Sequence, residues 1–302
     1  MDTDRVVAAG RERLLLFANR RAGTLARSGP GVTLEQYARE AGLDVQVVYT
    51  RSSSSLRRQL REQVVGKRER VLVAGGDGTI HAAVQELAGT GVELGILPQG
   101  TANNFATALR LPMDLPSAFR VLAEGQVEAV DLGDVGGEYF TEAAGVGVFA
   151  DILAITGAKH DARTVLRGIA QGMRLLLTMK PQRLSLVLDG RRYTEETMSV
   201  TVANSYCVGL NLPIAPCARL TDGQFHVIVI GALTRREMFA YYQAIRTQTH
   251  LDLPKVHALQ AREVQIAARR RLIAHVDDRV RRRTPLTARI RPGALKVVVD
   301  RL

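Results

Sequence analysis

Apolar and amphipathic segments alternate along the first 125 residues of the chain. Four short apolar runs have the length and composition of buried strands. Each is followed by a segment with apolar residues at helical spacing, and Thr33 and Gly42 supply start and stop signals for the first helix. Repeated strand–helix units form parallel sheets covered by helices on both faces, so this half predicts an α/β domain. Strands are expected at Leu14–Ala18, Val45–Tyr49, Arg70–Ala74 and Leu94–Leu97, and helices at Thr33–Ala41, Ser55–Val65, Ile80–Leu87 and Ala102–Leu109.

The pattern changes near residue 126, where short β-rich runs separated by glycine, proline and aspartate begin. Such runs are typical of a largely antiparallel, sandwich-like domain. We therefore predict a two-domain α/β protein, with an α/β domain over residues 1–126 and a β-rich domain over 127–289, and with a last strand at about 290–302 that returns to the first domain. The expected strands are Val127–Leu132, Tyr139–Ala144, Arg183–Leu188, Ser199–Ala203, Phe225–Ile230, Glu263–Ala267, Arg271–His275 and Leu295–Val299, and the expected helices are Thr164–Met179 and Arg235–Ile245.

The charge balance favours anionic partners. The chain has 41 Lys and Arg residues against 30 Asp and Glu, a net charge of +11. Nucleotides, nucleic acids and anionic lipid headgroups all fit such a surplus, and solubility alone is a competing explanation. Aromatic residues make up only 5% of the chain and do not interleave with the arginine runs at 269–271 and 281–283, so we expect no nucleic-acid partner.

The remaining composition bears on localisation. Cys207 and Cys217 lack the spacing of a zinc site, and two free thiols suit a reducing cytoplasm. The first residues lack the apolar core of a signal peptide. No apolar run reaches the roughly 18 residues that a membrane-spanning helix needs. We expect a soluble, cytoplasmic protein that contacts membranes only at their surface.

The strongest chemical motif follows the third expected strand and precedes a helix. It consists of Gly75, Gly76, Asp77, Gly78 and Thr79. Glycines let a phosphate approach the backbone closely, and a helix N-terminus directs N–H groups at it. An aspartate in such a loop suggests that Mg²⁺ bridges it to the phosphate. A tight strand-to-helix turn without a ligand is the alternative.

A second glycine turn follows the next expected strand, in the string Pro98-Gln99-Gly100-Thr101-Ala102-Asn103-Asn104. Thr101 is a candidate helix cap, and Asn103 is placed to contact an adenine edge or a ribose hydroxyl. Open α/β sheets bind ligands at the carboxyl ends of their strands. Two adjacent glycine turns at that edge therefore favour a nucleotide site.

Together, GGDGT and LGILPQGTANNFATAL resemble the diacylglycerol kinase catalytic-domain superfamily, which includes bacterial soluble lipid kinases and sphingosine kinases. The resemblance continues in order through most of the chain. It covers the segments 130–133, 142–147, 202–204 and 214–223, then Asp277 and the pair Thr284-Pro285. GGDGT alone also occurs in NAD kinases, whereas its combination with GTANN and the late Pro-x-Ala-x-x-x-Asp-Gly string is specific.

The resemblance implies an ATP- and Mg²⁺-dependent lipid kinase of phospholipid metabolism, with its active site in the cleft between the domains. It implies that the Gly75–Thr79 loop binds the ATP phosphates, with Asp77 acting through Mg²⁺, and that Asn19, Gly100, Thr101 and Asn103 line the nucleotide site. Asp131 matches a position in the family's metal and water network, and Asp222 one that binds a structural Mg²⁺. Asp277 aligns with the proposed general base. The partners so implied are ATP and a lipid at an anionic membrane surface; a homodimer would be unsurprising.

Four departures from the family pattern concern the site. Asn19-Arg20-Arg21-Ala22-Gly23 replaces Asn-Pro-x-Ser-Gly, and Asn104 replaces an aspartate. His81-Ala82 replaces Asn-Glu, and we interpret His81 as a helix-surface residue. Asp277-Asp278-Arg279 replaces Asp-Gly-Glu, so that an arginine takes the place of a glutamate that supports the base; Asp278 is a candidate substitute.

Several interpretations remain open at this point. Residues Thr164–Pro181 fit an interfacial helix on anionic lipid, or an ordinary amphipathic helix packed on its own domain. The acceptor alcohol could be diacylglycerol or another lipid, a sphingoid base, or NAD. The Asp278-Arg279 change also raises the alternative of a non-catalytic nucleotide-binding regulator. The retained aspartates at 77, 131, 222 and 277 favour an enzyme.

Overall fold

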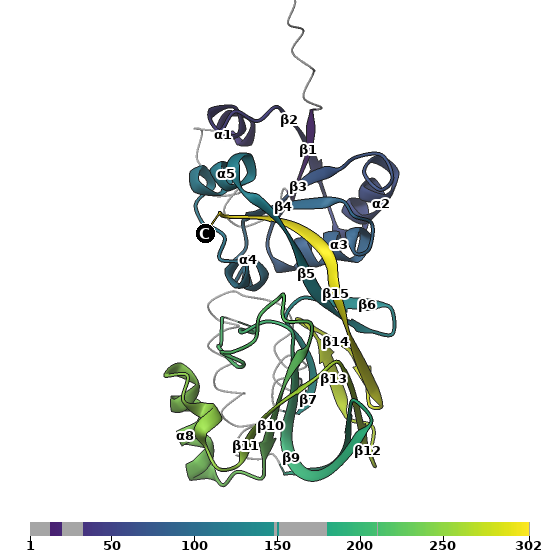
Figure 1. Cartoon of the computed structure of the whole chain (residues 1–302), viewed down its shortest axis with the longest axis vertical. Coiled ribbons are helices and arrows are strands. Elements are labelled where there is room, and N and C mark those ends of the chain that lie inside the picture. Colours follow the sequence, from purple (N-terminus) through teal and green to yellow (C-terminus); the bar gives the residue numbers. More distant parts are fainter. Residues whose placement is uncertain (1–12, 20–32, 148–149, 151–179, 210, 302) are drawn as a thin grey trace, which may run out of the picture.

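The computed structural model describes residues 13–19, 33–147, 150, 180–209 and 211–301 (Figure 1). The chain begins with strand–helix units in the order expected from the sequence. They comprise β1 (Leu14–Asn19), α1 (Leu34–Glu40), β2 (Val45–Thr50), α2 (Ser53–Gln63), β3 (Arg70–Gly75), α3 (Asp77–Leu87), β4 (Glu93–Pro98), α4 (Asn104–Ala108) and α5 (Leu115–Glu124). Thr33 caps α1 through a capping box with Gln36, which confirms the predicted start signal. Helix α5, which follows Asp114 as its cap, is absent from the sequence prediction.

The N-terminal sheet is parallel and is covered on both faces. Strands β2, β1, β3 and β4 lie in that order, all parallel. Alternate residues of β3 point to opposite faces, so Val71 and Val73 pack in the cluster with α2 and α3, while Leu72 packs in the cluster with α1 and α5. This confirms the predicted α/β architecture.

The second half is β-rich and largely antiparallel, as predicted. Its elements are β5 (Gln126–Val135), β6 (Glu138–Phe140), β7 (Ala143–Gly147), β8 (Gln182–Leu188), β9 (Arg191–Ala203), β10 (Phe225–Gly231), α8 (Arg235–Arg246), β11 (Val256–Ala261), β12 (Glu263–Ala268), β13 (Ile273–Val276), β14 (Arg279–Arg283) and β15 (Leu286–Val299), with a 3₁₀ turn at His250–Asp252. The single strand expected at Tyr139–Ala144 is instead two strands, because the chain turns at Thr141 and Glu142. The helix expected at Thr164–Met179 lies outside the described residues.

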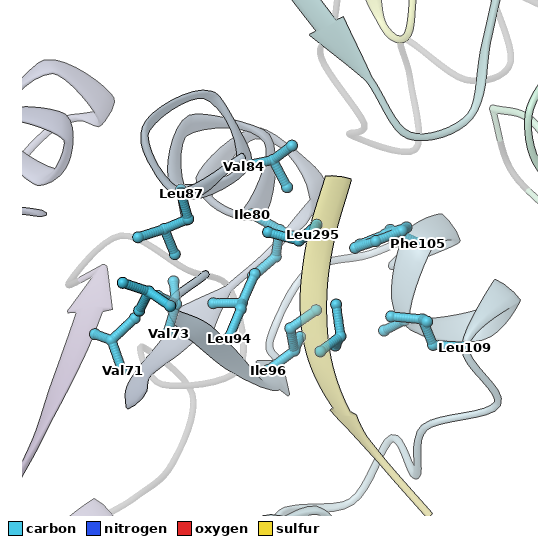
Figure 2. Close-up of a cluster of buried hydrophobic side chains, with 14 of the residues drawn as sticks. Val71, Val73, Ile80, Val84, Leu87, Leu94, Ile96, Phe105, Leu109 and Leu295 are labelled. Carbon is cyan, nitrogen blue, oxygen red and sulfur yellow. The ribbon is translucent and has the colours of Figure 1, made fainter. Parts of the chain in front are cut away.

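Strand β15 joins the two halves. Near its end it pairs in parallel with β4, through Lys296 and Val297, and along most of its length it pairs with β5. Its first residues pair with β12 in the β-rich half. Figure 2 shows Leu295 of β15 among side chains from β3, β4 and α3, with Phe105 of α4 and Leu109, the residue after that helix, beside it. The sheet is therefore continuous from one half to the other across the described strands.

Two further sequence expectations concern single features. Cys207, which is buried, and Cys217, which is exposed, are both free thiols. Among the described residues, no helix is both long and apolar enough to cross a membrane.

Candidate active site

The two glycine turns meet at the carboxyl ends of β3 and β4. These strands are parallel neighbours, and Gly75 lies opposite Pro98. The Gln99 N–H donates to the Gly75 carbonyl at 2.9 Å. A Cβ atom on Gly76 would lie 2.8 Å from the Cα of Gly100, and one on Gly100 would lie 2.5 Å from the Cα of Gly76. Only glycine permits so close an approach of the two backbones.

Asp77 is the first residue of α3, which begins three residues before the Ile80 expected from the sequence. Gly78 and Thr79 therefore lie in the first helical turn rather than in a loop. The Asn103 N–H donates to Asp77 Oδ2 at 2.9 Å. Burial raises the pKa of Asp77, and backbone N–H groups of residues 103–105 oppose that rise. Asn19, at the end of β1, donates from Nδ2 to Thr79 Oγ1 at 3.2 Å.

The second turn differs from the prediction in its cap. Asn103, with a left-handed φ of 50°, precedes α4, so Thr101 is not its N-cap. The Asn103 side chain folds back onto Gly100: Oδ1 accepts from the Gly100 N–H at 2.8 Å, and Nδ2 donates to the Gly100 carbonyl at 3.1 Å. Its amide therefore holds the turn in shape, whereas Thr101 is exposed.

Asp277 lies in the turn between β13 and β14 and reaches across to the β6–β7 connection. Its backbone has a φ of 49°, and only 5% of the residue is exposed. Oδ1 accepts from the N–H groups of Glu142 at 2.8 Å and Ala143 at 3.3 Å. Oδ2 accepts from the Thr141 N–H at 3.1 Å and the Thr141 hydroxyl at 3.4 Å. The turn that interrupts the expected strand at 139–144 thus forms the cradle of this carboxylate.

The interpretation of His81 as a helix-surface residue is wrong. Only 4% of His81 is exposed, and its Nδ1 lies 3.1 Å from Asp277 Oδ2. α3 brings this ring from the N-terminal half against an aspartate of the C-terminal half. The sequence alone does not show this, because the two residues are 196 positions apart.

Glu142 and Asn104 also belong to the site, although the prediction did not single them out as site residues. Asn104 Nδ2 donates to Glu142 Oε2 at 3.0 Å, and the Gly209 N–H donates to the same oxygen at 3.2 Å. Burial, and then the nearby carboxylates of Asp277 and Asp77, raise the pKa of Glu142 well above its usual range. The available signal was the position of both residues inside the strings that carry the family resemblance.

These groups enclose a small cavity of about 10 Å³ between the two halves of the molecule. That volume is close to the space that one water-sized atom occupies. Carboxylates from both halves meet here with one imidazole ring. The lining residues are Asp77, Ile80, His81, Phe105, Thr141, Glu142, Asp277 and Asp278.

Asp131 and Asp222, the predicted metal ligands, lie apart from this cavity. Asp131 accepts backbone N–H groups from Gly293 at 2.8 Å and Gly223 at 2.7 Å. Asp222 contacts the His226 ring at 3.0 Å and also accepts backbone N–H groups. Within the described ranges, no three His, Cys, Asp or Glu side chains converge on a common point where a metal could bind. A magnesium ion at these two residues stays a prediction.

The remaining sequence departures can be placed in part. Arg279 Nε lies 3.6 Å from Asp278 Oδ1, so these neighbours form an ion pair at the edge of the cavity. The replaced residues at 20–23 lie outside the described part of the chain, as does most of the segment considered for membrane contact.

Comparisons with known proteins agree with the fold, an α/β half followed by a β-rich half. Residues 13–135 match the model of the diacylglycerol kinase catalytic domain, and residues 143–299 match the YegS C-terminal NAD kinase beta sandwich-like domain. The chain is 26% identical over 244 residues to the diacylglycerol kinase of Bacillus subtilis (strain 168), covering 79% of this chain and 80% of the relative. It is 29% identical over 240 residues to the diacylglycerol kinase of Mycobacterium tuberculosis (strain ATCC 25618 / H37Rv), covering 74% and 75%.

The fold has a close counterpart among solved structures. The crystal structure of a diacylglycerol kinase from Bacillus anthracis str. Sterne superposes with a TM-score of 0.76 at 21% sequence identity, and the match covers 96% of this chain and 97% of that one. The two domain matches together span most of the sequence. The match to the YegS C-terminal domain is the longer of the two and spans more than half of the chain. The chain therefore belongs to the diacylglycerol kinase family of lipid kinases.

Proposed function

We propose that this protein transfers the γ-phosphoryl group of ATP to a hydroxyl group of diacylglycerol or a similar lipid, in a magnesium-dependent reaction. The observation that carries the proposal is the shared cavity: Asp77, at the end of the glycine turns, and Asp277, from the other half of the chain, line the same space. Phosphoryl transfer needs this combination, because the protein mainly positions phosphate and acceptor and offsets charge.

The roles follow from position. The backbone N–H groups at the start of α3, together with Gly100, would bind the phosphates of ATP. Asp77 would hold the magnesium ion that accompanies ATP; burial disfavours its charged form, and a cation would offset that cost. Mg²⁺ neutralises charge on the transferring phosphate. Asp277, with the His81 ring that contacts it, would supply the basic side of the site, where the attacking hydroxyl loses its proton.

The lipid reaches such a site from a membrane surface. The net charge of +11 favours an anionic bilayer as the place of contact. In this proposal the association is peripheral, and Asp131 and Asp222 act at a second, structural magnesium site. A homodimer stays a prediction.

The test is transfer of labelled γ-phosphate from ATP into a lipid panel in mixed micelles, with and without Mg²⁺. The panel contains diacylglycerol and phosphatidylglycerol, and sphingosine and NAD are assayed in parallel. Label in one lipid, lost on chelation of the metal, is the expected result and identifies the acceptor. Label in NAD alone would contradict the proposed substrate class.

A second candidate is a nucleotide-binding regulator without activity, and one observation favours it. Arg279, at the position of a supporting glutamate in the family, is paired with Asp278 beside the cavity. ATP binding without transfer to any acceptor would support this alternative, and Arg279→Glu would then be the first variant to assay for restored transfer.

A further inference from the structure

The imidazole ring of His81 occupies a position that the family resemblance does not account for. We propose that His81 Nε2 accepts the proton of the attacking hydroxyl, and that Asp277 is the positioning residue that orients the ring. This inference rests on the proposed kinase function and assigns the proton-accepting atom within it.

The hydrogen bonds of Asp277 determine which nitrogen of the His81 ring carries the proton. Each carboxylate oxygen already accepts at least one backbone N–H, from Thr141 on Oδ2 and from Glu142 and Ala143 on Oδ1. A carboxylate only accepts hydrogen bonds, so the His81 Nδ1 that lies 3.1 Å from Oδ2 must donate. In the neutral ring the proton is then on Nδ1, and Nε2 carries a free lone pair.

That second nitrogen is the available base. His81 Nε2 is buried and has no hydrogen-bond partner among the described residues. The ring lines the cavity of about 10 Å³, which has room for one oxygen atom. A buried nitrogen without a partner is costly in a folded protein, which points to a ligand group as its intended partner. The hydroxyl oxygen of the acceptor has the right size and carries the proton that Nε2 can accept.

The other groups at the cavity are less suited to the task. Burial raises the pKa of Glu142, which favours its protonated form, and its Oε2 already accepts from Asn104 and Gly209. Asp278 is paired with Arg279. The lone pairs of Asp277 are directed at four backbone and side-chain donors besides His81.

Proton transfer to His81 accompanies the transfer of the phosphoryl group. The acceptor oxygen forms a bond to the γ-phosphorus of ATP, the bond from that phosphorus to the β–γ bridging oxygen breaks, and ADP leaves with its electron pair. The hydroxyl proton moves to His81 Nε2. The resulting imidazolium is stabilised by Asp277, in the way that an aspartate supports the histidine of a hydrolase triad. The proton then passes to solvent when the phosphorylated lipid leaves.

The decisive variant is His81→Asn, because the asparagine amide can still donate to Asp277 but cannot accept a proton. General-base catalysis contributes on the order of 10²–10⁴-fold. We therefore expect kcat to fall by at least about a hundredfold, with the KM for ATP little changed. The matched control is His257→Ala, at an exposed histidine of β11, which should keep the wild-type kcat. A His81→Asn enzyme that keeps kcat within a few-fold would overturn the proposal.

Chemical rescue supplies an independent readout. In His81→Ala the ring is gone, so added imidazole should raise kcat in proportion to its concentration, and the gain should follow the basicity of substituted imidazoles. A purely structural role for His81 predicts no such dependence, and its absence in a folded His81→Ala protein that binds ATP would count against the proposal.

The tautomer of His81 can be measured without turnover, by ¹⁵N NMR of the histidine-labelled protein with Asp277→Asn for assignment. The proposal requires the proton on Nδ1 and an unprotonated Nε2; the opposite tautomer would refute it.

If the wild-type protein phosphorylates no acceptor at all, the proposed function fails. If the wild-type protein and the His81→Asn variant are both active, only the role of His81 is overturned.

Discussion

At the scale of single residues, Asp277 and Asp278 are adjacent but differ in almost every physical respect. Asp277 is buried and its carboxylate contacts Thr141, Glu142, Ala143 and His81. Asp278 is partly exposed and is paired with Arg279. If only one of these two carboxylates takes part in the reaction, substitutions at the two positions should have very different effects on kcat.

We predict that Asp277→Asn lowers kcat by at least about a hundredfold, because the amide neither orients the His81 ring through a charge nor stabilises the imidazolium. Asp278→Asn, the matched neighbour, should leave kcat within a few-fold. Steady-state kinetics with the acceptor lipid measures both, and circular dichroism checks that each variant is folded. Equal losses at the two positions would show that the assignment of Asp277 is incorrect.

The buried carboxyl group of Glu142 gives a prediction for stability. Its pKa in the folded protein lies well above the usual range, because of burial and the neighbouring carboxylates. The folded state then keeps a proton that the unfolded state releases, so the stability from this group is present at low pH and is lost as the pH rises towards the raised pKa.

Glu142→Gln cannot ionise, yet it still offers an oxygen to Asn104 and Gly209. We expect the free energy of unfolding of this variant to increase relative to that of the wild type as the pH rises from about 5 to about 8. The difference should grow by at most about 1.4 kcal/mol per pH unit. Chemical denaturation across this range measures the difference. Glu128→Gln, at an exposed position of β5, should show a constant difference, and a constant difference at Glu142 too would disprove the prediction.

At the scale of elements, the site depends on two strand-to-helix turns that touch. The β3–α3 turn supplies Asp77, the β4–α4 turn supplies Asn103, and the Asn103 N–H joins them at Asp77 Oδ2. The parallel pairing of β3 and β4 brings both turns to one edge of the sheet. Their distance is set by the lack of side chains at Gly76 and Gly100.

Gly100→Ala should force these turns apart. The added Cβ would lie 2.5 Å from the Cα of Gly76 and 2.7 Å from Asn103 Oδ1. We expect a loss of about 1–3 kcal/mol in the free energy of unfolding, together with weaker ATP binding. Thermal unfolding and calorimetric titration with ATP measure the two effects.

The same substitution at Gly78 serves as the control for stability, because nothing lies within 4 Å of a Cβ there and the residue is inside α3. Alanine is favoured over glycine in a helix by roughly 0.5–1 kcal/mol, so Gly78→Ala should raise the unfolding temperature. If Gly78→Ala and Gly100→Ala changed the unfolding temperature in a similar way, the close contact between the two turns would not be the reason for glycine at position 100.

At the scale of the whole molecule, β15 connects the two halves and the candidate active site lies between them (Figure 1). Its last residues belong to the core of the N-terminal half, where Leu295 and Val297 are fully enclosed. Its first residues, such as Leu286 and Ala288, belong to the core of the C-terminal half. A destabilising substitution at one end of β15 should therefore lower the stability of both halves.

We predict that Leu295→Ala destabilises the protein by about 2–5 kcal/mol, because it leaves a cavity in the core shown in Figure 2. The loss should appear as one cooperative transition, with far-ultraviolet and near-ultraviolet circular dichroism changing together. The adjacent Lys296→Ala, at an exposed side chain, is the control and should change stability by less than about 0.5 kcal/mol. Two separated transitions in Leu295→Ala would show that the halves unfold independently.

The sequence by itself determined the fold class and most of the elements. Hydrophobic periodicity gives the parallel strands of the first half and the β-rich character of the second, because buried positions must repeat with the period of the element that buries them. The glycine-rich turns after two strands located Gly76, Asp77 and Gly100, because tight strand-to-helix turns require glycine and can be recognised from the local sequence. The family strings added Asp277.

Only the tertiary structure decided which distant groups meet. His81 and Asp277 are 196 positions apart, and nothing local to either residue encodes their contact. Periodicity placed His81 on a helix but could not tell which face a second domain covers. The turn at Asn103 and the break at Thr141 likewise involve partners from elsewhere in the chain, Asp77 in one case and Asp277 in the other. Local patterns record how a segment is built, whereas the chemistry of the site depends on where the β-rich half packs against the first.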